Sequence, residues 1–170
     1  MSVEATEITD IHNKIQRAEE NYKRQLEWIT KTDTRCNIVI AILVGMVGFL
    51  ANIINGSILW SWYIISTFIV FSISAVATIF VIILSQYPKI ESPNMSLIYF
   101  NTIASLKNPD FVNGFKNLTD EEYLEDLLFQ THINANIVSR KINLIGISIK
   151  ILCVSISFWT FFMIMAKIPI

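Results

Sequence analysis

The stretch "WITKTDTRCNIVIAILVGMVGF", residues 28–49, decides the fold of this chain. Its first half carries Lys31, Asp33 and Arg35, whereas its second half carries no charge from Ile38 onward. No proline interrupts the stretch, so one helix can run through both halves. A helix with a charged half and a purely apolar half is typical of a chain that passes from water into a membrane. We therefore predict that a membrane span begins at Ile38.

Two further apolar runs follow, so the sequence predicts three spans. The first covers residues 38–54, the second residues 58–84 and the third residues 146–166 within an apolar run from residue 142. The chain is 53% hydrophobic and 16% charged, whereas soluble domains have about 25% charged residues. Burying three such helices in a soluble bundle would require far more polar surface than this chain has.

The distribution of Lys and Arg predicts the orientation of these spans. Six precede the first span, none lies between the first and second, five lie between the second and third, and one follows. Because basic residues concentrate on the cytoplasmic side, we expect a cytoplasmic N-terminus and an outer C-terminus. The expected protein is an all-α, multi-pass membrane protein, a single domain over residues 1–170. Its cytoplasmic parts are residues 1–37 and 85–145, which form a small helical bundle from helical extensions of the spans.

The cytoplasmic segments show helical signals and one region of turns. Residues 8–35 carry an apolar stripe, which can pack on the chain's own central helix or on copies of itself; it includes Ile8, Ile11, Ile15 and Tyr22. Residues 107–117, "KNPDFVNGFKN", favour turns. Thr119 and Glu122 then form a capping box, and no break is visible from there to Gly146.

Small residues on the first span suggest contacts between copies. Ala41, Gly45 and Gly48 share one face, on which two helices can approach closely. Three thin helices cannot enclose a water path alone. We therefore expect a homo-oligomer.

Signatures of catalysis are missing from the sequence. His12 and His132 stand alone on predicted helices, and no metal-ligand spacing, nucleophile motif or phosphate loop is present. The scattered basic residues do not make a nucleic-acid site. We expect no catalytic residue, no metal and no cofactor, and hence a protein that is not an enzyme.

The remaining chemistry is a set of polar and aromatic residues predicted at the inner membrane edge. Cations suit a phosphate, aromatic rings suit a flat base, and an amide or acid suits base edges or sugar hydroxyls. The set comprises Asp33, Arg35, Tyr99, Phe100, Asp126, Gln130, Arg140 and Lys141. An acid near an anionic leaflet needs a cation, so Asp33 either pairs with Arg35 or a neighbouring helix, or belongs to a polar site.

Lys150 raises a similar question inside the third apolar run. A Lys at the middle of a bilayer costs roughly 2.5–3.5 kcal/mol. If the span begins at residue 151, the side chain reaches the inner interface by snorkelling. The alternative is a charge that faces a protein interior or an aqueous path.

The order of these motifs resembles the transmembrane effector family of Pycsar antiphage systems. The resemblance rests on "WITKTDTRCNIVIAI", "LIYFNTIAS" and "YLEDLLFQTHINANIVSRKINLI", and covers nearly the whole chain after residue 25. The family's pattern has Asp-x-Lys/Arg before the first span and Tyr-Phe after the second span. Before the third span it has an Asp, a Gln four residues later, and then a basic residue. Arg35 stands where the family more often has Lys, and Cys36 where Ala is usual, which leaves charge and size little changed.

The resemblance implies a function that composition alone does not. A partner pyrimidine nucleotide cyclase makes cyclic CMP or cyclic UMP; the effector responds, impairs the bacterial inner membrane and causes abortive infection. The eight polar residues above are then the expected ligand site. Two alternatives remain: a ligand-independent holin-like or toxin-like membrane protein, and a membrane scaffold that anchors a cytoplasmic partner.

Overall fold

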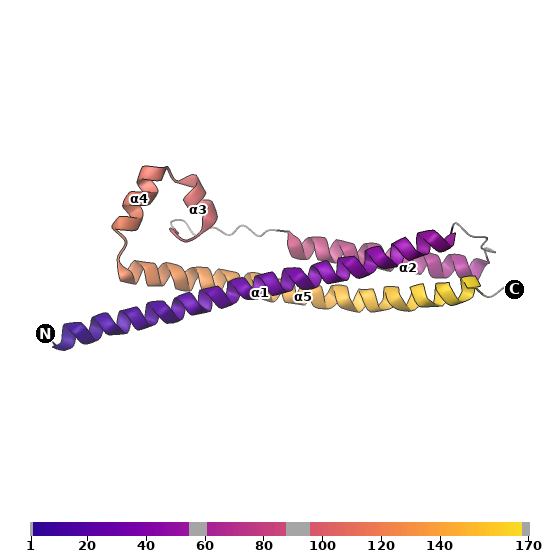
Figure 1. The fold of residues 1–170 in the computed structure, drawn as a ribbon, viewed down its shortest axis with the longest axis horizontal. Coiled ribbons are helices and arrows are strands. Elements are labelled where there is room, and N and C mark those ends of the chain that lie inside the picture. Colours follow the sequence, from indigo (N-terminus) through magenta and orange to yellow (C-terminus); the bar gives the residue numbers. More distant parts are fainter. Residues whose placement is uncertain (1, 55–60, 88–95, 168–170) are drawn as a thin grey trace. The chain divides into compact units, whose positions relative to one another are not determined.

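Helices account for almost all of the residues that the structure describes. The computed structural model describes residues 2–54, 61–87 and 96–167, and the side chains of residues 2–8 and 167 lie outside this description. The described residues are 92% helical, and no strand occurs among them. Figure 1 shows the elements, which are α1 (Ser2–Ile54), α2 (Trp62–Gln86), α3 (Phe100–Ser105), α4 (Asn108–Lys116) and α5 (Asp120–Lys167). The predicted all-α fold with three membrane-length helices is confirmed.

The two long helices are continuous because nothing in their sequences breaks them. Neither α1 nor α5 contains proline. The predicted capping box starts α5: the Glu122 carboxylate accepts the Thr119 backbone N–H at 2.9 Å, and the Thr119 hydroxyl accepts the Glu122 N–H at 3.3 Å. The first of these bonds, chiefly, lowers the pKa of the Glu122 carboxyl. The unbroken helix expected from Thr119 through Gly146 is therefore present.

The region of expected turns contains a helix instead. Asn108–Lys116 forms the nine-residue α4, with Pro109 in its first turn and Lys116 in its last. Proline is tolerated there because its missing N–H would have no helical partner anyway. The start of the second span, placed at residue 58, lies outside the described residues; the helix itself begins at Trp62.

The chain divides into two compact units. The polar unit consists of residues 1–30 and 88–139, and the span unit consists of residues 31–87 and 140–170. Helices α1 and α5 each contribute residues to both units. In the polar unit, the buried hydrophobic residues that the structure describes are Ala18 of α1 and Leu127, Ile133 and Val138 of α5.

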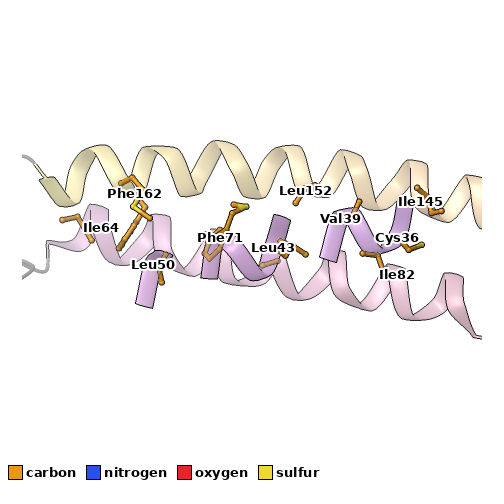
Figure 2. Close-up of a cluster of buried hydrophobic side chains, with 13 residues drawn as sticks. Cys36, Val39, Leu43, Leu50, Ile64, Phe71, Ile82, Ile145, Leu152 and Phe162 are labelled. Carbon is orange, nitrogen blue, oxygen red and sulfur yellow. The ribbon is translucent and has the colours of Figure 1, made fainter. Parts of the chain in front are cut away.

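The core of the span unit is a cluster of thirteen buried hydrophobic residues from α1, α2 and α5 (Figure 2). The α1 residues recur at alternating steps of three and four, which is the spacing of a helix face that packs on other helices. They are Cys36, Val39, Leu43, Met46 and Leu50. On α5, Ile145, Leu152 and Phe162 point into the same cluster.

Small hydroxyl residues line the contact between α2 and α5. The Ser155 hydroxyl donates to the Ser74 hydroxyl at 2.8 Å, and both side chains are at least nine-tenths buried. Thr78 and Ser148 are fully buried and bond to carbonyls of their own helices. Small residues allow two helices to approach closely where lipid supplies no hydrophobic drive for association. The contact therefore depends on close packing and hydrogen bonds.

The outer surface of the span unit is apolar. Val44, Ile73 and Val76 are exposed by 65%, 65% and 67%, and many other large hydrophobic side chains are exposed on all three helices. Three helices are long and apolar enough to cross a membrane. A soluble protein rarely exposes contiguous apolar surface of this size, so the chain is a membrane protein.

Candidate ligand site and helix contacts

An ion pair joins α1 and α5 within the span unit. The Lys141 ammonium lies 2.5 Å from the Asp33 carboxylate. The Lys141 side chain is only 13% exposed and that of Asp33 is 39% exposed, so the pair is partly shielded from solvent. Asp33, which lies between Lys31 and Arg35 in the sequence, therefore forms its ion pair with a lysine of another helix.

The same ammonium also contacts α2. Lys141 Nζ lies 3.4 Å from the Gln86 side-chain oxygen, at the last residue of α2. One side chain of α5 thus contacts both other helices of the span unit. The predicted phosphate ligands Arg35 and Arg140 belong to the same unit, and both are exposed.

In the polar unit, Asp126 of α5 holds the segment that leads into α3. Its carboxylate accepts the Ser96 hydroxyl and the Leu97 backbone N–H, each at 3.0 Å. Ser96 Oγ in turn accepts the backbone N–H groups of Ile98 and Tyr99, at 3.2 and 3.0 Å. Ser96 is 2% exposed. This relay fixes the backbone immediately before the Tyr99–Phe100 pair.

The aromatic pair is presented at the start of α3. The Tyr99 and Phe100 ring centroids are 4.9 Å apart, with the ring planes tilted by 50°. Phe100 is 69% exposed. An exposed aromatic ring on a fixed backbone is a suitable stacking surface for a flat heterocycle.

Gln130, one helical turn after Asp126, is the second buried polar residue among those that the structure describes in this unit. Its side chain is 1% exposed, and its amide nitrogen has no hydrogen-bond partner in the described part of the chain. A buried polar group without a partner costs roughly 1–3 kcal/mol. Such a group is unusual in a folded protein, and a bound ligand that accepts a hydrogen bond would relieve the cost.

Two tyrosines connect α1 with α5 in the same unit. The Tyr123 hydroxyl donates to the Glu19 carboxylate at 3.0 Å, and burial together with this bond raises the pKa of Tyr123. Burial, chiefly, also raises the pKa of Tyr22, opposed by a hydrogen bond with Asn134 and assisted by the charge of Asp126. Both phenols are therefore neutral at physiological pH.

The eight residues predicted for a ligand site are divided equally between the units. Asp33, Arg35, Arg140 and Lys141 lie in the span unit; Tyr99, Phe100, Asp126 and Gln130 lie in the polar unit. In the span unit, Asp33 contacts Lys141. In the polar unit, Tyr99 lies two residues after Leu97, whose backbone N–H donates to Asp126, and the Tyr99 N–H itself donates to Ser96 Oγ. A single pocket formed by all eight stays a prediction.

Sequence reasoning missed Ser96 and Gln86. A lone serine after two prolines and a glutamine at the end of a span carry no distinctive local pattern. Their roles depend on which residues of other helices lie opposite them, and only the fold shows this.

The two sets of residues predicted for contacts between copies, one on the first span and one on the N-terminal stripe, differ in their exposure. Ala41, Gly45 and Gly48 are exposed, and a Cβ added at either glycine would meet nothing within 4 Å. Ile11, Ile15 and Tyr22 are half-buried in the polar unit, and the side chain of Ile8 lies outside the description. The chain's own packing therefore leaves the small-residue face free and partly uses the N-terminal stripe. Assembly through either surface stays a prediction.

The fold and contacts define a helical membrane protein with three membrane-length helices, two of which also contribute residues to a polar unit. The family model of the Pycsar effector protein domain matches residues 17–166, and the chain belongs to this family. No curated protein and no solved structure matches the chain.

As a member of this family, the chain is an effector of antiphage defence in a bacterial membrane. The family also implies pairing with a cyclase and a cyclic nucleotide signal. The resemblance inferred from the sequence motifs is therefore confirmed.

Proposed function

We propose that this effector binds cyclic CMP or cyclic UMP made by a partner pyrimidine cyclase, and then impairs the bacterial inner membrane. The result is abortive infection: the cell dies before phage matures. The protein acts through binding and conformational change rather than catalysis. The family match over residues 17–166 carries this proposal. The cytoplasmic N-terminus predicted from the basic residues would place the polar unit where the nucleotide is made.

The polar unit supports nucleotide recognition by three features. Phe100 and Tyr99 offer aromatic surface for the base, and the Asp126–Ser96 relay holds their backbone in place. The buried Gln130 amide nitrogen is a donor without a partner in the described residues, suited to a carbonyl or phosphate oxygen. A pyrimidine ring presents a carbonyl oxygen, and a cyclic phosphate presents further acceptors.

Continuity of two helices supports transmission of the signal. Helices α1 and α5 run without a break from residues of the polar unit into apolar spans. A ligand that favours one packing of these helices over another shifts the population of the corresponding membrane arrangement. The Asp33–Lys141 pair is one contact that such a change would strengthen or break.

Leakage of a fluorescent dye from liposomes tests the proposal. Purified protein is reconstituted, and cyclic CMP, cyclic UMP or cyclic AMP is added to the side of the polar unit. We expect leakage with one or both pyrimidine nucleotides and none with cyclic AMP. Leakage without any nucleotide would instead favour a holin-like protein, and no leakage under any condition would favour a scaffold.

A further inference from the structure

One face of α5 is polar where it should contact lipid. Asn143, Lys150, Cys153 and Ser157 are all exposed, and they recur with Gly146 at steps of three and four residues. The helical period places these five residues on one face. A Cβ added at Gly146 would meet nothing within 4 Å, so the chain's own helices do not cover this position.

The packed face of α5 is a different one. Ile145, Leu152 and Phe162 enter the core of the span unit, and Ser155 bonds to Ser74 of α2. Two rows of exposed apolar side chains flank the polar face at seven-residue spacing: Ile142, Ile149 and Ile156 on one side, and Ile147, Val154 and Phe161 on the other. Packing of the chain's own spans therefore does not explain the polar face.

Lys150 lies well inside the span. Ser74, the partner of Ser155, is twelve residues from each end of α2, so this pair marks the middle of that helix. Lys150 precedes Ser155 by five residues, or about 7.5 Å along the axis. It has no ion pair or hydrogen bond within the described residues. If Lys150 faced lipid, its ammonium would place a charge in or near the hydrocarbon core. Charges in such positions are energetically costly and usually have a function.

The polar face changes character toward the C-terminal end of α5. From Asn143 to Ser157 it extends about 21 Å along the axis. Beyond Ser157 the same face carries the exposed Thr160 and Ile164, and Phe161 of the flanking row lies beside them; Phe161 and Ile164 are exposed by 46% and 54%. An apolar pair that follows a polar stretch has the composition of a constriction that gates water by dewetting.

We propose that several copies of the chain assemble with this face of α5 around a water-filled path. Asn143, Lys150 and Ser157 line its polar part, and Phe161 and Ile164 form its apolar constriction. The lysines of the copies form a positive ring, which favours anions. The path is incomplete in one chain, because the interior of the three-helix core is filled by side chains. This inference rests on the proposed membrane impairment and names the surface that produces it.

The native cysteines provide a direct test. Cys153 lies on the proposed path and is exposed, whereas Cys36 is fully buried. A charged, membrane-impermeant methanethiosulfonate reagent reacts with a thiol that water reaches, because the thiolate is the nucleophile. In liposomes opened by the pyrimidine nucleotide, we expect labelling of Cys153, detected by peptide mass, together with a lower conductance. Cys153→Ser should remove both effects.

A lipid-facing cysteine is the matched control. In the Cys153→Ser background, Val76→Cys places a thiol on the exposed apolar surface of α2, where Val76 is 67% exposed. This thiol should stay unlabelled under the same conditions. Equal labelling at both positions, or an unlabelled Cys153 in leaking liposomes, would overturn the proposed path.

Ion selectivity gives a second, independent measurement. In planar bilayers under a salt gradient, we expect the parent to prefer anions, and Lys150→Glu to reverse the sign of the zero-current potential. Lys107→Glu is the control, since it makes the same charge change at an exposed position outside the three apolar helices. Nucleotide-triggered leakage with unchanged selectivity in Lys150→Glu would refute this inference alone. Absence of leakage in the parent would refute the proposed function as well.

Discussion

The Lys141 ammonium of α5 lies 2.5 Å from the Asp33 carboxylate of α1, although 108 residues separate them in sequence. Lys141 also contacts Gln86 at the end of α2. A partly shielded ion pair lies between two limits: exposed pairs contribute about 0–1 kcal/mol, whereas breaking a fully buried pair costs about 3–5 kcal/mol. This contact is therefore a candidate for both stability and switching.

Asp33→Asn should destabilise the protein, because it leaves the largely buried Lys141 ammonium without its charged partner. We expect a loss of about 1–3 kcal/mol, between the two limits above, measured as unfolding in detergent. Asp10→Asn is the matched control, since the Asp10–Lys14 pair is exposed on both sides and its loss should have little effect. The double exchange Asp33→Lys with Lys141→Asp should recover part of the stability. Equal effects of Asp33→Asn and Asp10→Asn would contradict the assigned role.

Gln130→Leu should separate stability from ligand response. Removing a buried amide whose nitrogen has no partner in the described residues should leave stability unchanged or raise it, by up to about 1–3 kcal/mol. Binding of cyclic CMP or cyclic UMP, followed by calorimetry, should be lost. Gln16→Leu makes the same change at an exposed position of α1 and should preserve binding. A stable Gln130→Leu protein that still binds the nucleotide would remove Gln130 from the site.

Asp126→Ala should loosen the segment that carries Tyr99 and Phe100. It removes the acceptor of the Ser96 hydroxyl and the Leu97 N–H, and hydrogen bonds to a charged group contribute about 1.5–3 kcal/mol. We expect faster hydrogen exchange of backbone amides over residues 97–105, with α5 little affected. Glu125→Ala, at the exposed neighbouring position, should leave the exchange unchanged. Slow exchange in Asp126→Ala would show that other contacts hold the segment.

Gly45→Leu tests assembly through the small-residue face of α1. A Cβ added at this position meets nothing within 4 Å, so the fold should tolerate a larger side chain. We expect a smaller complex in detergent and less toxicity, because a bulky side chain would separate neighbouring copies. Val47→Leu, at an exposed apolar position of the same helix, is the control. An unchanged mass of the Gly45→Leu complex would exclude this face as the interface.

Topology can be measured directly with reporter fusions after Ile54, Asn117 and Ile170. The distribution of basic residues predicts outside, inside and outside, respectively. A C-terminal reporter on the inside would mean a missing or an additional span.

Much of the fold could be predicted from the sequence because its determinants are local. A long apolar run without proline must form a helix in lipid, since the backbone has no other hydrogen-bond partners there. The capping box at Thr119 and the absence of breakers predicted the uninterrupted α5 in the same way. The α4 helix was missed because Pro109, Asn113 and Gly114 have individual turn preferences, although a proline in the first turn is compatible with a helix.

The sequence by itself thus determined that the chain forms long helices, that three of them are apolar enough to cross a membrane, and which motifs it shares with its family. Only the tertiary structure decided that Asp33 contacts Lys141, that Gln130 is buried, and that Lys150 and Gly45 are exposed. The physical reason is that helical periodicity sets which residues share a face. Which face is buried, and which residues of another helix lie opposite it, depend on how distant helices pack together.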